Sequence, residues 1–151
     1  MQVSHRFSPD SVAFDDDNLV SHAGLVPVMT LAEQTGLHQL LADKVSITSP
    51  SVASAGANLS PKLATIIAGM CAGADSINDI EVLRAGGHKT LFTGVYAPAT
   101  LGQMLREFTF GHARQLDSVL TKHLHALTTR TALLPGAGER TFIDICLLYT
   151  S

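Results

Sequence analysis

The sequence contains 151 residues, about the length of one domain, and carries a formal net charge of −3. Hydrophobic residues make up 46% and charged residues 15%, which is enough apolar content for a core and excludes a wholly disordered chain. No apolar run approaches the roughly 18 residues that a membrane-spanning helix needs, so no membrane partner is expected. The two cysteines and the absence of a signal-peptide pattern at the start predict a cytoplasmic protein.

The charge is distributed unevenly along the chain. Residues 1–43 carry a net charge of −5, residues 44–130 carry +3, and the remainder carries −1. A basic middle segment behind an acidic front is compatible with nucleic-acid contact, although an ordinary solvated surface gives the same balance.

Residues 1–58 are expected to form an arm, two short helices and a linker. Residues 11–24 mix Val and Phe with an acidic run, which indicates an extended arm or a short strand. Residues 25–45 have a helical pattern that is interrupted at Gly36. Residues 46–61 are rich in Ser, Pro, Gly and Ala and predict a loop. One face of the second helix carries Leu37, Leu40 and Leu41.

Residues 59–135 are expected to form a block of helices. Ser60 and Pro61 have the pattern of an N-cap followed by the first helical position. The helix after them has an apolar stripe that is expected to be buried, with its cysteine as a small core residue rather than a reactive thiol. A short helix over residues 76–87 is expected next, capped by Asp75 or Ser76 and ended by Gly86 and Gly87. The apolar stripe consists of Leu63, Ile66, Ile67, Met70 and Cys71.

Two more helices complete this block. Thr100 is expected to cap the first, and the second, the longest, extends from about Phe110 to Arg130. Residues 134–140 predict a turn, and the change of period over residues 139–145 indicates the first strand of a new unit. The apolar positions are Leu101, Met104, Leu105 and Phe108 in the first helix and Leu116, Val119, Leu120, Leu124 and Leu127 in the second.

The usual catalytic and metal-binding motifs are absent from the sequence. The seven histidines are scattered, and the acidic run Asp15–Asp17 lacks the alternating ligands and closing glutamate of a calcium loop. No phosphate-binding glycine loop, dinucleotide fingerprint or nucleophile elbow occurs.

The helices predicted over residues 77–87 and 99–108 form a candidate helix-turn-helix pair. The second helix would present Thr100, Gln103 and Arg106 to DNA, where Gln can recognise adenine, Arg guanine and Thr a phosphate. An ordinary helical bundle explains the same residues. The residues by themselves favour the bundle, because the connection is longer than the usual three or four residues.

The segment LFTGVYAPATLGQMLREFTFGHARQLDSVLTKHL, residues 91–124, resembles the N-terminal part of bacterial insertion-sequence transposases of the DDE superfamily, group 1. The matching features are a proline and Thr-Leu that open a helix, Phe-Thr-Phe-Gly-His at its end, and Arg-Gln-Leu-Asp in the next helix. The similarity covers roughly residues 10–145. The matching positions are Pro98, Thr100, Leu101, Gly102, Phe108 to His112 and Arg114 to Asp117.

The resemblance implies a mostly α-helical N-terminal region that ends at the first strand of a truncated ribonuclease-H-like α/β core. Three carboxylates of that core hold two Mg²⁺ or Mn²⁺ ions for phosphodiester cleavage and strand transfer. The segment TFIDI, residues 141–145, is similar to the motif that contains the first carboxylate. Asp144 is the nearest candidate, but the aligned position is occupied by Cys146, a poor ligand for a hard cation. The fragment alone is therefore expected to be inactive and to need no cofactor.

Residues 146–151 depart from the family pattern. The peptide CLLYTS is encoded by TGT CTC TTA TAC ACA TCT, which resembles the transposon-end adapter of sequencing libraries. These residues are expected to be an adapter-derived tail that follows the start of the core at residues 136–145, and they are excluded from the fold. A natural frameshifted end is the alternative.

The expected function is recognition of terminal inverted repeats, close to the bacterial nucleoid, with a homodimer in the full-length transposase. A small helix-turn-helix regulator without catalysis, and a helical interaction fragment that binds no nucleic acid, are the alternatives. Lysines and arginines would contact phosphates and make the affinity salt-dependent. The candidate DNA-binding residues are Arg84, Lys89, Thr100, Gln103, Arg106, Arg114 and Lys122.

Overall fold

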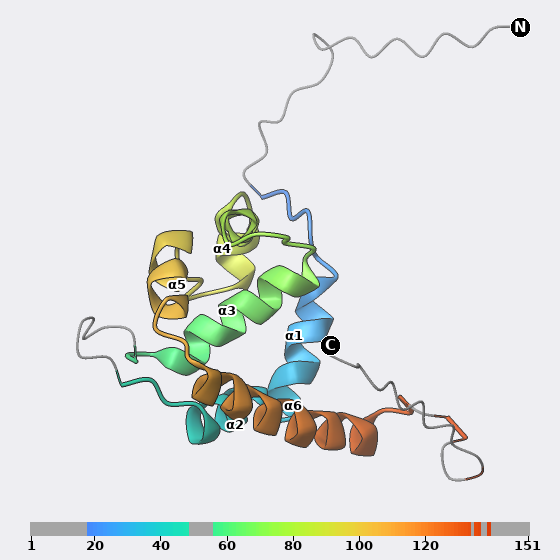
Figure 1. Ribbon diagram of the computed structural model, residues 1–151. Coiled ribbons are helices and arrows are strands. Elements are labelled where there is room, and N and C mark those ends of the chain that lie inside the picture. The colour runs from blue at the N-terminus through green and yellow to red at the C-terminus, as the bar shows by residue number, and fades with distance from the viewer. Residues whose placement is uncertain (1–17, 49–55, 134, 137–138, 140–151) are drawn as a thin grey trace, which may run out of the picture.

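The computed structural model of the protein describes residues 18–48, 56–133, 135–136 and 139, and within these residues every regular element is helical (Figure 1). The expectation of a mostly α-helical chain is confirmed for this part, whereas the strand predicted to reach residue 145 lies outside it. Among the described helices, none is both long and apolar enough to cross a membrane. The elements are α1 (Leu25–Gln34), α2 (Leu37–Lys44), α3 (Leu59–Cys71), the 3-10 helix η2 (Asn78–Arg84), α4 (His88–Leu91), α5 (Pro98–Leu105) and α6 (Phe110–Arg130).

The break between the first two helices lies where the sequence predicts it. Gly36 has φ +78°, a left-handed conformation that a side chain disfavours, and it separates α1 from α2. Leu37 and Leu41 are then buried, and Leu40 packs against the same core. Before α1, the described residues 18–24 form turns and irregular backbone rather than a strand.

The start of α3 differs from the expectation. The helix begins at Leu59, and its N-cap is Asn58 at φ +51°, not Ser60. The Ser60 hydroxyl instead donates a 2.9 Å hydrogen bond to the carbonyl oxygen of His38, which ties α3 to α2. Pro61 still lies in the first turn, where its missing N–H leaves no helical hydrogen bond unmade.

The buried face of α3 is rotated away from the predicted stripe. Leu63 is buried and Ile66 and Ile67 are partly buried, but Met70 is 66% exposed and Cys71 is also exposed, so the core role predicted for these two residues is wrong. The small residues Ala64, Ala68 and Gly69 of α3 are buried instead. Because small side chains allow a close approach of η2, they decide which face turns inward, and the spacing of the large residues does not show this.

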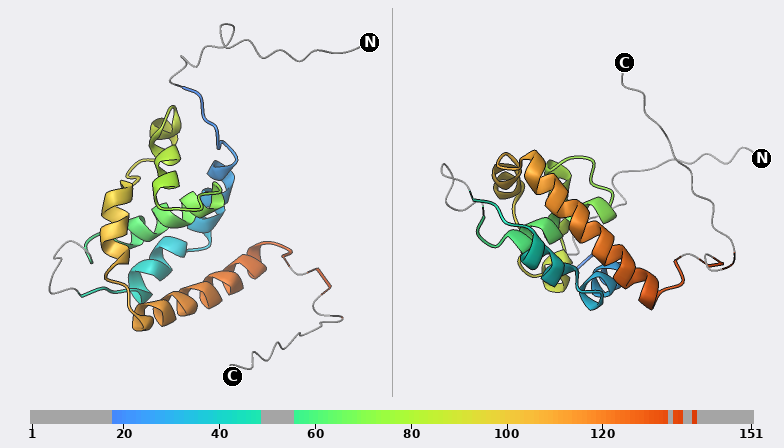
Figure 2. Two further views of the ribbon diagram at one scale, coloured as in Figure 1. Left: turned by 45° about the horizontal axis from the view of Figure 1, so that its top comes forward. Right: turned by 60° about the horizontal axis from the view of Figure 1, so that its bottom comes forward.

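Two apolar clusters hold the helices together. The first joins α1, α2, α3 and α6 with Met104 of α5, and the second joins the start of α1 with α3, η2 and α5. Figure 1 shows α3 at the centre, and the two views of Figure 2 show α6 along one side of the molecule, next to α2. The fully buried side chains Leu41, Leu83, Leu101 and Met104 belong to these two clusters.

A buried imidazole, His88, joins the segment before α1 to the start of α4. His88 Nε2 accepts a hydrogen bond of 3.3 Å from the backbone N–H of His22, and its Nδ1 lies 3.0 Å from the carbonyl oxygen of Ala85. This geometry fits a neutral ring with the proton on Nδ1. The helix predicted over 76–87 is the shorter 3-10 helix η2, and Ser76 does not cap it but donates to Asp79.

Pro98 and Thr109 lie at the starts of the last two helices, α5 (Pro98–Leu105) and α6 (Phe110–Arg130). Pro98 occupies the first position of α5 after the N-cap Ala97, so Thr100 is inside the helix and is not its cap. The bounds of α6 match the prediction, and His112 Nδ1 accepts a 2.9 Å hydrogen bond from the backbone N–H of Thr109 at its start.

The apolar face predicted for α6 is only partly buried. Val119 is buried and Leu116 is partly buried. Leu120 and Leu124, which belong to the predicted apolar face, are 65% and 49% exposed. The reason is that α6 packs mainly against α2, which covers one part of a wide apolar surface.

Candidate nucleic-acid interface

The predicted DNA-reading residues of α5 lie on its outer side. Leu101 and Met104 are 0% and 1% exposed, so they fix the inner face of the helix. Gln103 and Arg106 are exposed and Thr100 is partly exposed. Residues three apart lie on neighbouring positions of one helical face, so these three polar side chains share a surface.

The helix pair expected to form a helix-turn-helix is not a compact motif in this structure. Residues 85–97 separate η2 from α5 and include α4, and η2 itself is a 3-10 helix. The connection between α5 and α6 is much shorter, since only the four residues 106–109 separate them. That length is typical of a helix-turn-helix, but the residues predicted to read bases lie before α6 and not on it.

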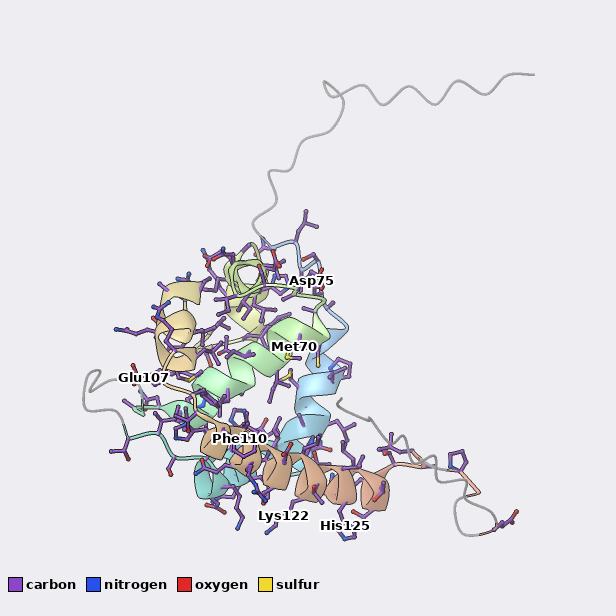
Figure 3. All side chains as sticks on the ribbon, viewed as in Figure 1. Met70, Asp75, Glu107, Phe110, Lys122 and His125 are labelled. Atoms are coloured by element: carbon purple, nitrogen blue, oxygen red, sulfur yellow. The ribbon has the colours of Figure 1, made fainter. Side chains whose placement is uncertain are left out.

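The exposed side of α6 carries a row of polar and basic residues. Arg114, Ser118, Lys122 and His125 follow one another at intervals of four, four and three, which places them along one side of the helix. Figure 3 shows Lys122 and His125 pointing away from the body of the molecule. Phe110, at the start of α6, is 78% exposed.

Lys44 joins this surface from a different helix. It ends α2, and it lies so near Lys122 that the contact and the like charge lower the pKa of Lys122 from its usual 10.5. The carboxylate of Asp43 acts in the opposite direction with a smaller effect. The packing of α2 on α6 therefore places Lys44 near Lys122 on an exposed surface, and the carboxylate of Asp43 lies near the same lysine.

The remaining basic candidates lie elsewhere. Both carboxylate oxygens of Glu81 are 2.8 Å from Arg84 Nη1, so this guanidinium already has an acidic partner. Lys89 of α4 is exposed and lines a shallow hollow together with Arg84. The structure therefore does not bring all seven candidates to one surface: Arg84 and Lys89 form one group, the α5 residues a second and the α6 residues a third.

The candidate metal ligand of the catalytic core is near the end of the sequence. Asp144 and Cys146 lie outside the described residues. Within the described residues, no three His, Cys, Asp or Glu side chains come together in a way that could hold a metal ion.

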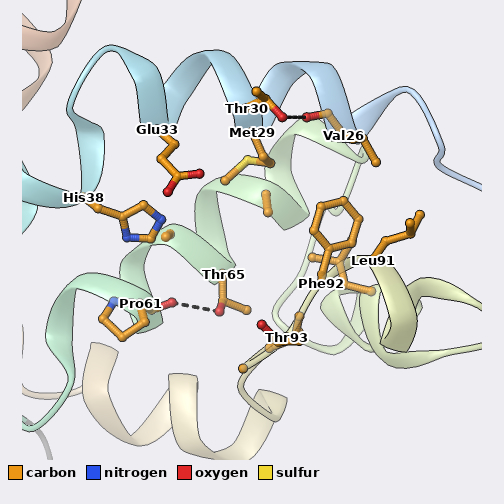
Figure 4. A pocket seen from close by; sticks show the side chains of 15 residues that line it. Val26, Met29, Thr30, Glu33, His38, Pro61, Thr65, Leu91, Phe92 and Thr93 are labelled. Carbon is orange, nitrogen blue, oxygen red and sulfur yellow. Dashed lines mark hydrogen bonds between the residues drawn. The ribbon is translucent and has the colours of Figure 1, made fainter.

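A second hollow of about 350 Å³ lies between α1, α3 and the segment after α4 (Figure 4). Glu33 and His38 are its titratable lining residues. The hydroxyls of Thr30 and Thr65 also line it, but each donates to a carbonyl of its own helix, at 2.8 Å. The hollow is therefore not equipped with a nucleophile activated by a base, and we assign it no chemistry.

Lys44 is the site residue that the sequence does not reveal. Its position in the last turn of a predicted helix is visible in the sequence, but its neighbour Lys122 is 78 positions away. No family model, no curated protein and no solved structure matches this chain.

Proposed function

We propose that this chain is the DNA-binding N-terminal part of an insertion-sequence transposase of the DDE type, and that it recognises the terminal inverted repeats of its element. The similarity of residues 91–124 to that family supports the assignment. The full-length protein would cleave and join DNA in the bacterial cytoplasm, at the nucleoid, as a homodimer.

The observation that carries the proposal is the packing of α2 on α6, which brings Lys44 to the same exposed surface as Arg114 and Lys122 of α6. A polyanion that binds at these exposed side chains gains from their positive charges, and salt screens that gain. Arg114 lies two helical turns before Lys122 on the same side of α6. The row extends the positive surface along the helix, as contact with successive phosphates requires.

Base recognition is assigned to α5 in this proposal. Gln103 and Arg106 are exposed and carry the side-chain groups that form paired hydrogen bonds with adenine and guanine. Phosphate contacts by the lysines would position the protein, and Gln103 of α5 and its C-cap residue Arg106 would distinguish sequences.

The resemblance also implies Mg²⁺ or Mn²⁺ for the catalytic core. The described residues do not fit a two-metal centre, since no suitable group of three ligands occurs among them. We therefore derive no catalytic step for this chain and assign it binding only.

A salt-titrated gel-shift assay tests the proposal, using a duplex from the element's terminal repeat and a scrambled duplex. We expect binding at low salt and a negative slope of the logarithm of affinity against the logarithm of salt concentration, of about 0.9 per phosphate contacted. The double variant Lys44→Gln/Lys122→Gln should reduce that slope by about 1.8 for both duplexes.

Arg84→Gln is the matched control, because this arginine is already paired with Glu81 and should leave the slope unchanged. Absence of binding at low salt, or binding that is indifferent to salt, would reject the proposal. The genomic sequence downstream of codon 145 separates the transposase from the small regulator. An open frame encoding two further spaced carboxylates supports the first, and a genuine stop codon after residue 151 supports the second.

A further inference from the structure

An apolar groove of about 450 Å³ lies between α1, α2, the end of α3 and α6. His123 is the polar residue in its α6 wall, and its Nε2 lies 2.8 Å from the Thr35 hydroxyl, so that polar atom has a partner. No carboxylate, lysine or arginine is among the lining residues. The groove therefore offers an apolar surface without a charged group to orient a polar ligand.

Large apolar side chains at the edge of this groove are exposed to water. Val28 is 46% exposed on the α1 side, and Leu120 and Leu133 are 65% and 47% exposed on the other side. Burial of such side chains is favourable in proportion to the apolar area removed from water. The groove is thus a surface on which an apolar peptide would be stabilised.

The size of the groove limits what fits. Along α6 the lining extends from Leu116 to Leu127, which corresponds to about 17 Å of helix at 1.5 Å per residue. An extended peptide rises about 3.3 Å per residue, so five residues span the same distance. The groove therefore matches a short extended segment.

The chain itself contains a five-residue, largely apolar segment in the sequence after α6. Residues 141–145 are Thr-Phe-Ile-Asp-Ile, and in an extended conformation Ile143 and Ile145 share one face with Thr141. The opposite face carries the only charge, Asp144, which would remain in water. Leu133 lines the end of the groove, so a connection of only seven residues joins the groove to the segment.

This tether favours the segment over a free partner. A connection of this length gives the attached segment an effective concentration of roughly millimolar, which exceeds that of ordinary partners in solution. We propose that residues 141–145 dock as an extended segment in the groove between α1, α3 and α6, with Ile143 and Ile145 inward. This docking concerns the 151-residue chain and is independent of DNA binding, whereas in a full-length transposase the same residues would belong to the first strand of the core.

Cys71 provides a reporter, because it is exposed and lines the groove. In the full chain with Cys146→Ser, Cys71 is the only thiol. We expect a neutral alkylating reagent to modify it roughly tenfold more slowly than in the same chain carrying Ile143→Asp and Ile145→Asp, since the charged segment should leave the groove. The matched control places two aspartates at Thr150 and Ser151, outside the segment, and should keep the slow rate.

Two outcomes would overturn the proposal. Equal alkylation rates in the three proteins would show that the segment does not cover Cys71. A rate that slows with increasing protein concentration, together with a dimer in sedimentation, would show that a second copy covers the groove instead. Circular dichroism of each variant checks that the helices are retained. Urea unfolding should show that the protein with Ile143→Asp and Ile145→Asp is less stable than the control with Thr150→Asp and Ser151→Asp.

Discussion

The contact between α3 and η2 depends on the absence of a side chain at Gly69. A Cβ atom at this position would lie 2.7 Å from Cγ1 of Ile80, a distance at which one of the two must move. Ile80 is 3% exposed and belongs to the second apolar cluster, so it has little space to withdraw. We therefore expect Gly69→Ala to destabilise the protein although it lies inside a helix.

Two opposing effects set the magnitude. Alanine favours the helix over glycine by about 0.5–1 kcal/mol. Overpacking a buried contact costs about 1–3 kcal/mol. The free energy of unfolding should consequently fall by about 1–2 kcal/mol in Gly69→Ala.

Urea unfolding of a double-mutant cycle tests this explanation. Ile80→Ala removes Cγ1 and should cost about 2–5 kcal/mol by itself. In that background Gly69→Ala should become stabilising by about 0.5–1 kcal/mol, because only its helix preference remains. The explanation would be refuted if Gly69→Ala lowered stability equally in both backgrounds.

Three further predictions concern single positions. Burial lowers the pKa of His123 below 6.5, so the folded protein binds this proton less readily than the unfolded chain. The urea midpoint should therefore fall as the pH decreases from about 6.5, and it should fall less steeply in His123→Leu. If the midpoint of His123→Leu fell as steeply as that of the control His125→Gln, the prediction would be contradicted. Gly36 has φ +78° and open space around it, so Gly36→Ala should lower the free energy of unfolding by about 1 kcal/mol through backbone strain alone. Gly36→Asn should cost less. Equal stability of the unchanged protein and both variants in urea unfolding would show that no strain exists. Hydrogen bonds from the hydroxyl and backbone N–H of Ser76 lower the pKa of Asp79 below 3.8. Ser76→Ala should raise this pKa in a carbon-detected NMR titration. An unchanged titration midpoint of Asp79 would show that the hydroxyl hydrogen bond has no effect.

Local signals in the sequence were sufficient to predict where several helices begin and end. The break at Gly36 and the bounds of α6 follow from glycine chemistry and from a long apolar period, which act within a few residues along the chain. Ser60 shows where such signals fail. Its side chain suits an N-cap, but the nearby carbonyl of His38 provides a competing acceptor that belongs to another helix.

The sequence by itself determined the helical class, the positions of most helices and the basic character of the middle segment. Only the tertiary structure decided that Met70, Cys71 and Leu120 face outward and that Lys44 lies beside Lys122. The physical reason is that helical periodicity identifies a stripe of residues but not the partner that covers it. Coverage depends on how closely neighbouring helices approach, and Gly69 of α3 permits such an approach by Ile80 of η2.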